Sequence, residues 1–303
     1  MIISKIEHIS LRVPDLEVAV EFYESLFGLV EIARNENGVY LATGKSPTFD
    51  VHLTEGANRL DHFAFGVRSA EALEEARTRL SAAGVTYQDS GAINDPGLDD
   101  GIILSLPSGH VMELVLAANP RTFVPNTDAP AAHHRVTGPI PLEHITLLTS
   151  SIRPVVEFLV DTLDWRISDS WQPGEGQPWR NTWIRAGELH HDLAFLYSES
   201  ETPELHHFCF AVPSVQDMVR VADALGARGI PLDASFGRHI AGNNVFLYFK
   251  DPFGNRCEVN TDMARIDPAA PPRVSRTSFP FDAWQQKRPE ALVAGSPVRD
   301  GRS

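Results

Sequence analysis

The chain has 303 residues, 43% of them apolar and 22% charged, which predicts a soluble globular protein with room for two domains. A formal net charge of -14 without a lysine or arginine cluster argues against nucleic acid and anionic membrane surfaces as partners. The first ten residues do not form a signal peptide, no apolar run could span a bilayer, and two cysteines give no disulfide framework, so a cytoplasmic location is predicted.

The first half of the chain alternates helix and strand signals. A helix is expected over residues 16–26, after Pro14 and Asp15. A second helix is expected to begin after Ser69, whose hydroxyl suits an N-cap, and to end near Gly84. Alternating or β-branched residues predict strands over residues 39–42, 62–67 and 102–106.

The second half repeats this order after a Pro-rich, weakly periodic linker. Helices are expected over residues 155–163, after Arg153 and Pro154, and between Ser214 and Gly229. Strands are predicted over residues 193–197, 208–212 and 245–249. Beyond Asp267 the sequence is rich in proline and arginine and has no counterpart in the first half, so it is predicted to be a tail.

Three motifs occur once in each half and in the same order. Ile6-Glu-His-Ile-Ser-Leu11 corresponds to Leu142-Glu-His-Ile-Thr-Leu147, Leu60-Asp-His-Phe to Leu205-His-His-Phe, and Pro107-Ser-Gly-His-Val-Met-Glu113 to Pro252-Phe-Gly-Asn-Arg-Cys-Glu258. The numbering differs by 136 at the first motif and by 145 at the others, so the second copy holds nine extra residues, expected in 170–183 or 198–204. The predicted fold is α+β, with paired βαβββ modules.

Each motif contributes one potential metal ligand. Buried imidazoles and carboxylates without partners cost several kcal/mol, roughly, so packing alone does not explain them at three matched strand positions in both halves. Two imidazoles and one carboxylate form a facial triad, which leaves the opposite metal positions open and suits non-haem Fe(II). The triads are His144, His207 and Glu258 in the second half and His8, His62 and Glu113 in the first.

The second triad includes only one histidine of the pair His206-His207. The register with His62-Phe63 selects His207 as the ligand. Because side chains alternate along a strand, His206 is expected to point to the opposite face.

The chain resembles the type I extradiol ring-cleaving dioxygenases of the vicinal oxygen chelate superfamily. The motifs that carry the resemblance are Leu142-Glu-His-Ile, Leu205-His-His-Phe, Gly237-Arg-His-Ile and the segment from Tyr248 to Glu258. The resemblance covers nearly the whole chain. It implies two tandem domains, each an incomplete β-barrel, with the metal held by His144, His207 and Glu258.

The resemblance also implies the residues around the metal. His191 is expected to act as an acid or base facing oxygen, and His239 and Tyr248 to hydrogen-bond the bound catecholate. Trp183 and Thr146 are expected to contact the substrate. The alternative for Trp183 is that it is an ordinary core tryptophan. The first half has Asn94 and Ile103 at the positions of His239 and Tyr248, so the second half is predicted to be the catalytic one.

The implied reaction is extradiol (meta) cleavage of a catechol, with both atoms of O2 incorporated and a 2-hydroxymuconic semialdehyde-type product. Fe(II) is the expected cofactor, and Mn(II) accepts the same donors. Ala234 stands where carboxylate-binding relatives have an arginine, which favours a neutral, alkyl- or aryl-substituted catechol unless Arg273 or Arg276 of the tail compensates. A homo-oligomer, preferably a tetramer, is the expected assembly.

The predicted domain layout follows from these assignments. It comprises a non-catalytic domain (residues 1–120), a linker (121–140), a catalytic domain (141–266) and a tail (267–303) that would cover the active site. The triad of the first half is expected to be a remnant of duplication, with a second metal as the alternative. Cys209 and Cys257 are interpreted as buried apolar residues rather than ligands.

Two other functions remain as alternatives. One is a glyoxalase-like metal-dependent lyase or isomerase, which would usually need a second acidic ligand. The other is a non-catalytic binding protein of the bleomycin-resistance type, which would have no use for a metal triad.

Overall fold

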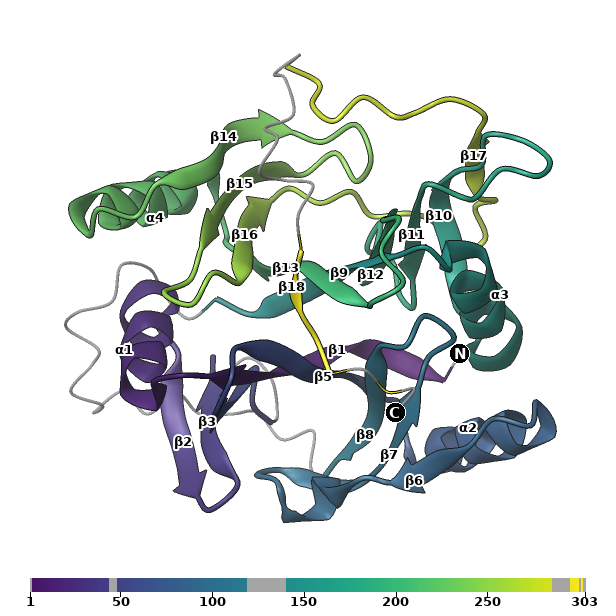
Figure 1. The fold of residues 1–303 in the computed structure, drawn as a ribbon, viewed down its shortest axis with the longest axis horizontal. Coiled ribbons are helices and arrows are strands. Elements are labelled where there is room, and N and C mark those ends of the chain that lie inside the picture. The colour runs from purple at the N-terminus through teal and green to yellow at the C-terminus, as the bar shows by residue number, and fades with distance from the viewer. Residues whose placement is uncertain (1, 44–47, 119–139, 285–294, 300, 302–303) are drawn as a thin grey trace.

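The strands form two β-sheets, one from each half of the chain, and these sheets lie side by side in the computed structural model (Figure 1). The structure describes residues 2–43, 48–118, 140–284, 295–299 and 301. The predicted linker, residues 121–140, therefore lies outside the described residues except for its last position.

The first sheet has eight strands in the order β2-β3-β4-β1-β5-β8-β7-β6, so two βαβββ modules meet at the central pair β1 and β5. Its elements are β1 (Ile3–Val13), α1 (Leu16–Phe27), β2 (Val30–Asn35), β3 (Gly38–Ala42), β4 (Val51–Glu55), β5 (Arg59–Val67), α2 (Ala70–Ala82), β6 (Tyr87–Asp89), the short helix η1 (Gly91–Asn94), β7 (Leu98–Ser105) and β8 (Val111–Ala117).

The second sheet repeats this order, with β13 and β9 at its centre. Its elements are β9 (Leu142–Thr149), α3 (Ile152–Leu163), β10 (Arg166–Trp171), β11 (Asn181–Arg185), β12 (Leu193–Tyr197), β13 (Glu204–Ala211), α4 (Val215–Ala227), β14 (Leu232–Arg238), β15 (Val245–Lys250) and β16 (Arg256–Thr261). The tail adds β17 (Arg273–Ser275) beside β10 and β18 (Ser296–Pro297) beside β13. The predicted α+β fold of paired βαβββ modules is confirmed.

Local sequence signals explain where the helices begin and end. Asp15 and Ser69 accept hydrogen bonds from the backbone amides of Val18 and Ala72, and Ser214 caps α4 in the same way as Ser69 caps α2. Gly28 ends α1 in the left-handed conformation, with φ of 67°. Helix α3 begins at Ile152, three residues before the predicted start. In the described part of the chain, no helix combines the length and apolar character needed to cross a membrane.

The extra residues of the second copy lie mainly between β10 and β11. The corresponding strands of the first half, β2 and β3, are joined by a tight turn between Asn35 and Gly38. In the second half the connection runs from Trp171 to Asn181. The first of the two predicted locations for the insertion is therefore confirmed.

Aromatic side chains join the two halves into one core. Phe27 of α1 is fully buried, and its ring stacks on that of Phe210 with centroids 4.2 Å apart. Phe249 lies against the same ring. Beside them the Tyr23 hydroxyl donates a 2.9 Å hydrogen bond to Asp251 Oδ2. Helix α1 of the first half thus packs directly on β13, which carries His207, and on β15.

Phe27→Ala is expected to lower the free energy of unfolding by about 3–5 kcal/mol, because it leaves a cavity at the junction of the two halves. Urea denaturation followed by far-UV circular dichroism measures this loss. Val18→Ala on the same helix is the control, since Val18 is 42% exposed and its truncation should change stability by less than about 0.5 kcal/mol. Equal effects of the two substitutions would show that α1 does not anchor this junction.

Candidate metal centre

Three neighbouring strands bring His144, His207 and Glu258 together. The strands β16, β13 and β9 are adjacent, and Cys209 of β13 pairs with both His144 and Glu258. His207 Nε2 lies 3.0 Å from Glu258 Oε2 and 3.3 Å from His144 Nε2, and His144 Nε2 lies 3.4 Å from Glu258 Oε2. All three residues are buried, so the predicted ligands converge on one point.

The electrostatics of this cluster favour a cation. Burial alone would raise the pKa of Glu258, but hydrogen bonds from His144 and His207 hold it well below its usual range, so the carboxylate is ionised. Burial lowers the pKa of His144, but Glu143 and Glu258 outweigh it and raise that pKa to about 9. Burial lowers the pKa of His207 to about 4 despite Glu258. A divalent metal would therefore displace one proton, on His144.

Amide and carboxylate groups next to the triad contact its side chains and orient them. Asn244 Nδ2 donates to Glu258 Oε1 at 3.0 Å. His144 Nδ1 lies 3.4 Å from Glu143 Oε2, which also accepts a 2.6 Å hydrogen bond from Asn260 Nδ2. Such contacts fix the tautomer and direction of a metal ligand. Neither role was identified from the sequence: Glu143 lies in the repeated motif Leu142-Glu-His-Ile, of which only the histidine was considered, and Asn244 belongs to none of the repeated motifs.

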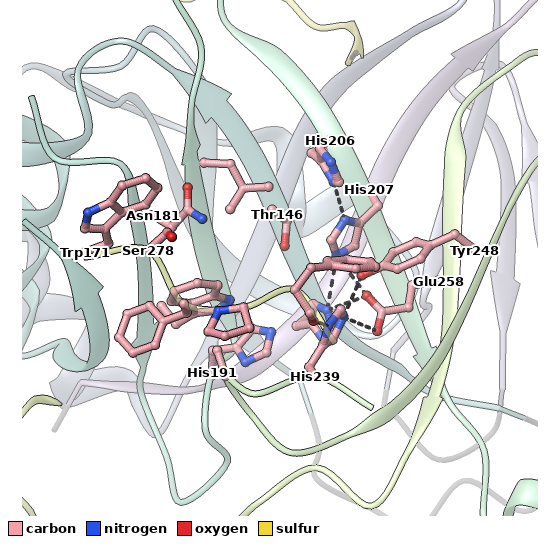
Figure 2. Close-up of a pocket in the computed structure, with 17 residues that line it drawn as sticks. Thr146, Trp171, Asn181, His191, His206, His207, His239, Tyr248, Glu258 and Ser278 are labelled. Carbon is pink, nitrogen blue, oxygen red and sulfur yellow. Dashed lines mark hydrogen bonds and ion pairs between the residues drawn. The ribbon is translucent and has the colours of Figure 1, made fainter. Parts of the chain in front are cut away.

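His239 and Tyr248 form a hydrogen-bonded pair beside Glu258 (Figure 2). His239 Nδ1 donates to the carbonyl oxygen of Phe281 at 3.0 Å, so Nε2 of the neutral ring accepts from the Tyr248 hydroxyl at 2.9 Å. Burial lowers the pKa of His239, which keeps the ring neutral. His239 Nε2 is 3.8 Å from Glu258 Oε1, so the pair lies next to the predicted ligands.

His191 is held by a chain of polar contacts that sequence reasoning missed. Its Nδ1 lies 3.0 Å from His190 Nδ1, and His190 Nε2 donates to Asp169 Oδ2 at 3.1 Å. Arg273 of the tail donates to the same carboxylate at 2.7 Å. Burial, together with the nearby charge of His144, lowers the pKa of His191 well below 6.5. Because His190 donates from Nε2 to Asp169, its Nδ1 accepts from His191 Nδ1, and His191 Nε2 keeps a free lone pair.

The expectation that His206 points away from the site is wrong. A β-bulge shifts the pairing of β13 with β9 between Leu205 and His207, so simple alternation fails at this point. His206 Nδ1 lies 2.6 Å from His207 Nδ1, and His206 lines the same cavity as His207 (Figure 2). It therefore supports the ligand ring.

A cavity of about 190 Å³ opens next to the triad. All eight predicted site residues line it: His144, Thr146, Trp183, His191, His207, His239, Tyr248 and Glu258. The tail closes it with residues 278–281, and Trp171 and Asn181 border its far end (Figure 2). Trp183 packs edge-on against Phe279 of the tail, with ring centroids 5.8 Å apart. Buried Thr146 Oγ1 forms no hydrogen bond within the described residues.

The cavity wall is neutral apart from the triad and the other histidines. Among the described residues that line it, Glu258 is the only carboxylate and none is lysine or arginine. Arg273 is occupied by Asp169 and lies over the Phe279 ring, and Arg276 donates to the Gln172 carbonyl. Ala234 packs in a buried cluster with Phe246 and Tyr248. Arg273 and Arg276 therefore do not replace the arginine that carboxylate-binding relatives have at the position of Ala234.

Both cysteines are buried and free. Cys209 lies close enough to Glu143 and His144 to share an ion with them. Burial raises the pKa of the Cys209 thiol well above its usual value, so the thiol stays protonated and is a poor ligand.

Comparison with known proteins places the chain in a family. The sequence profile of the Glyoxalase/Bleomycin resistance protein/Dioxygenase superfamily matches residues 5–114 and 142–259. The chain is 27% identical over 268 residues to a manganese-dependent 2,3-dihydroxybiphenyl 1,2-dioxygenase of Geobacillus genomosp. 3, covering 85% of this chain and 84% of that protein. It is 26% identical over 301 residues to an iron-dependent extradiol dioxygenase of Rhodococcus jostii (strain RHA1), covering 94% and 97%.

Among solved structures, the 2,3-dioxygenase LapB from Pseudomonas sp. KL28 matches with a TM-score of 0.82 and 25% identity, covering 90% of this chain and 97% of that one. The resemblance to extradiol dioxygenases that the motifs indicated is therefore confirmed at the level of sequence and fold.

Asn244→Ala is expected to weaken metal binding by about 10- to 100-fold, because Glu258 loses the hydrogen bond that orients it. Titration of the stripped protein with Mn(II) in competition with a chelator measures the affinity, in a Glu113→Gln background so that the cluster of His8, His62 and Glu113 does not contribute. Gln88→Ala, at an exposed position of β6, should leave it unchanged. An unaltered affinity in Asn244→Ala would show that the carboxylate is oriented without this amide.

Proposed function

We propose that this chain, which belongs to the Glyoxalase/Bleomycin resistance protein/Dioxygenase superfamily, is a metal-dependent extradiol dioxygenase that cleaves a catechol ring and incorporates both atoms of O2. One observation carries the proposal: two imidazoles and one carboxylate meet at the wall of an aromatic cavity that also holds His191, His239 and Tyr248. This set combines a place for a metal with groups that can move and hold protons.

The residues of the second triad fit a divalent metal. His144, His207 and Glu258 would hold it, since their ligand atoms are buried and lie within 4.8 Å of one another. We propose Fe(II), with Mn(II) as the alternative, because relatives with both metals are similar to this chain. When bound, the ion would supply a Lewis acid that lowers the pKa of the catechol hydroxyls and a redox-active centre for the reaction with O2.

The neighbouring side chains would handle the protons and the negative charge. Neutral His191, with its Nδ1 directed at His190, can accept a proton at Nε2 and return it later. The Tyr248 hydroxyl, which donates to His239 Nε2 at 2.9 Å, can turn its proton to an oxygen of the substrate anion, and His239 can donate from Nε2 once it has taken up a proton there. These roles rest on the position of each residue at the cavity wall.

The aromatic wall would orient the ring and exclude water. Trp183, Phe279 and Phe281 line the cavity, and the last two belong to the tail. The tail is held in place where Arg273 binds Asp169 and where the Phe281 carbonyl accepts from His239. We propose that this segment encloses the substrate, as expected of a cover.

Two rival functions fit less well. A glyoxalase-like lyase usually needs a second acidic ligand, whereas Glu258 is the sole carboxylate among the described residues at the cavity wall. A binding protein of the bleomycin-resistance type would have no use for a buried His-His-Glu cluster or for the polar chain behind His191.

Anaerobic loading with Fe(II), or separately with Mn(II), followed by catechol and air-saturated buffer tests the proposal. One O2 should be consumed per catechol, with a yellow ring-opened product, as followed by an oxygen electrode and visible absorbance. Glu258→Gln should lose more than about 100-fold in activity, because a lost ligand affects the metal more than a lost outer contact does. Turnover of a glutathione hemithioacetal without oxygen uptake would instead support the lyase.

The neutral cavity predicts the charge of the preferred substrate. The value of kcat/KM should be at least about 10-fold higher for 4-ethylcatechol than for 3,4-dihydroxyphenylacetate, because the carboxylate would be buried without a partner. Asn181→Arg, at the far end of the cavity, should lower the ratio of kcat/KM for 4-ethylcatechol to kcat/KM for 3,4-dihydroxyphenylacetate, because it gives the carboxylate a partner. The neutral control Asn181→Gln should leave this ratio unchanged. A preference for the carboxylated catechol in the wild-type protein would contradict this account.

A further inference from the structure

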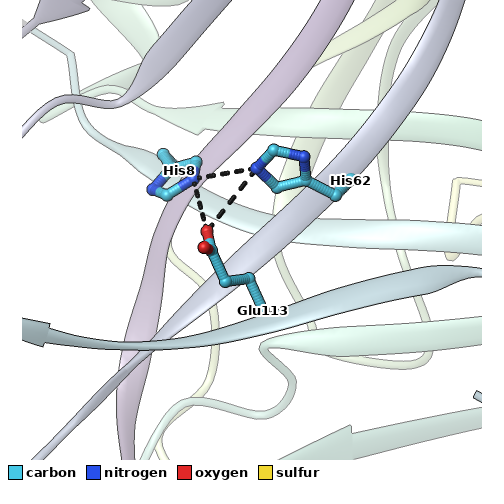
Figure 3. A group of neighbouring side chains, drawn as sticks. All are labelled: His8, His62 and Glu113. Carbon is cyan, nitrogen blue, oxygen red and sulfur yellow. Dashed lines mark hydrogen bonds and ion pairs between the residues drawn. The ribbon is translucent and has the colours of Figure 1, made fainter. Parts of the chain in front are cut away.

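A second cluster of potential metal ligands lies in the first half of the chain, outside the proposed active site (Figure 3). His8 of β1, His62 of β5 and Glu113 of β8 point toward one another from three adjacent strands. His8 Nε2 lies 3.3 Å from Glu113 Oε2 and 3.4 Å from His62 Nε2, and His62 Nε2 lies 3.5 Å from Glu113 Oε2. The three ligand atoms thus form a nearly equilateral triangle.

Strand register places this triangle in the same position as the triangle of the second half. Ala64 of β5 pairs with both His8 and Glu113, as Cys209 of β13 pairs with His144 and Glu258. The corresponding distances in the second half are 3.4, 3.3 and 3.0 Å. The backbone therefore presents the same three donors at the same spacing in both halves.

Hydrogen bonding accounts for this arrangement only in part. The two imidazole–carboxylate contacts, at 3.3 and 3.5 Å, are longer than the usual N–H···O range of about 2.7–3.2 Å, and the third contact is a long hydrogen bond of 3.4 Å between the two rings. Glu113 Oε2 and His8 Nδ1 form no hydrogen bond within the described residues, although both side chains are buried. Ligand atoms that share one ion through bonds of about 2.1 Å lie roughly 3.0 to 3.4 Å apart for octahedral and tetrahedral angles, respectively. A central cation would satisfy all three atoms at once.

The surroundings of the triangle also suit a cation. His62 Nδ1 lies 3.2 Å from Asp61 Oδ2, the carboxylate–imidazole contact that orients many metal-bound histidines. Asp95, which accepts a 2.6 Å hydrogen bond from the Tyr40 hydroxyl, also interacts electrostatically with His8 and His62. The His62 side chain is 15% exposed, so solvent can reach the cluster.

We propose that the first half binds one divalent transition-metal ion through His8, His62 and Glu113. Imidazole and carboxylate donors favour an ion such as Mn(II), Fe(II) or Zn(II). The site lacks the groups proposed for ring cleavage, since Ile103 pairs with Glu113 where Tyr248 pairs with Glu258, and Asn94 in place of His239 is exposed. The ion therefore ties β1, β5 and β8 together and takes no part in turnover.

Metal stoichiometry tests this site independently of activity. Full-length protein, stripped with a chelator and incubated anaerobically with excess Mn(II), is freed of unbound metal and measured by inductively coupled plasma mass spectrometry. Wild-type protein should hold two ions per chain, Glu113→Gln one, Glu258→Gln one and the double variant none. Glu55→Gln, an exposed change on the same sheet, should retain two.

The activity of the same variants separates the two sites. Glu113→Gln should keep catechol cleavage within about twofold of wild type, because it leaves the second half untouched, whereas Glu258→Gln should lose it. If catechol is not cleaved at all, the stoichiometry still decides whether the first site exists. Circular dichroism establishes that each variant is folded, and His62→Ala, a substitution at the rim of the cluster, should also hold one ion.

One ion per wild-type chain would overturn the proposal. Two ions in Glu113→Gln and His62→Ala would also overturn it, because the second ion would then lie elsewhere, for example near Glu143, His144 and Cys209.

Discussion

A carboxylate buried between two buried imidazoles is the constraint on which the second half of the molecule depends. Glu258 is 1% exposed and lies on the strand next to that of His207, which in turn borders the strand of His144. An ionised carboxylate in such a place is costly unless cations or donors compensate it. The amide of Asn244, the histidines and the metal that they would share provide this compensation, and the cavity opens on the same side.

Duplication explains why the two histidines and the glutamate of the site occur in both halves, whereas the groups around them occur in one half. Both sheets present two histidines and a glutamate in the same register; within the described residues, the second sheet alone has a tyrosine, Tyr248, paired with the glutamate and a tail over its cavity. The longer β10–β11 connection also belongs to the second half, and Trp171 and Asn181 at its ends line the cavity. The tail and the longer connection, which lie outside the repeat, thus complete a pocket whose triad and whose Tyr248 lie on repeated strands.

Repetition made the triads and most helices and strands predictable from sequence, since packing alone does not place matched ionisable residues at matched strand positions. The orientation of His206 was not predictable, because a β-bulge reverses the expected alternation. The chain from His191 through His190 to Asp169 and Arg273 was also missed, because it joins positions 104 residues apart without any sequence pattern. The cytoplasmic location and the tetramer stay predictions.

The most direct measurement of the central claim is anomalous diffraction at the metal absorption edge, from crystals grown anaerobically with Fe(II) or Mn(II). We expect a peak about 2.0–2.2 Å from His144 Nε2, His207 Nε2 and Glu258, with no further protein atom as a ligand. The absence of a peak at these atoms, or a fourth protein donor on the open side, would contradict the account, and the separate peak proposed at His8, His62 and Glu113 does not bear on it.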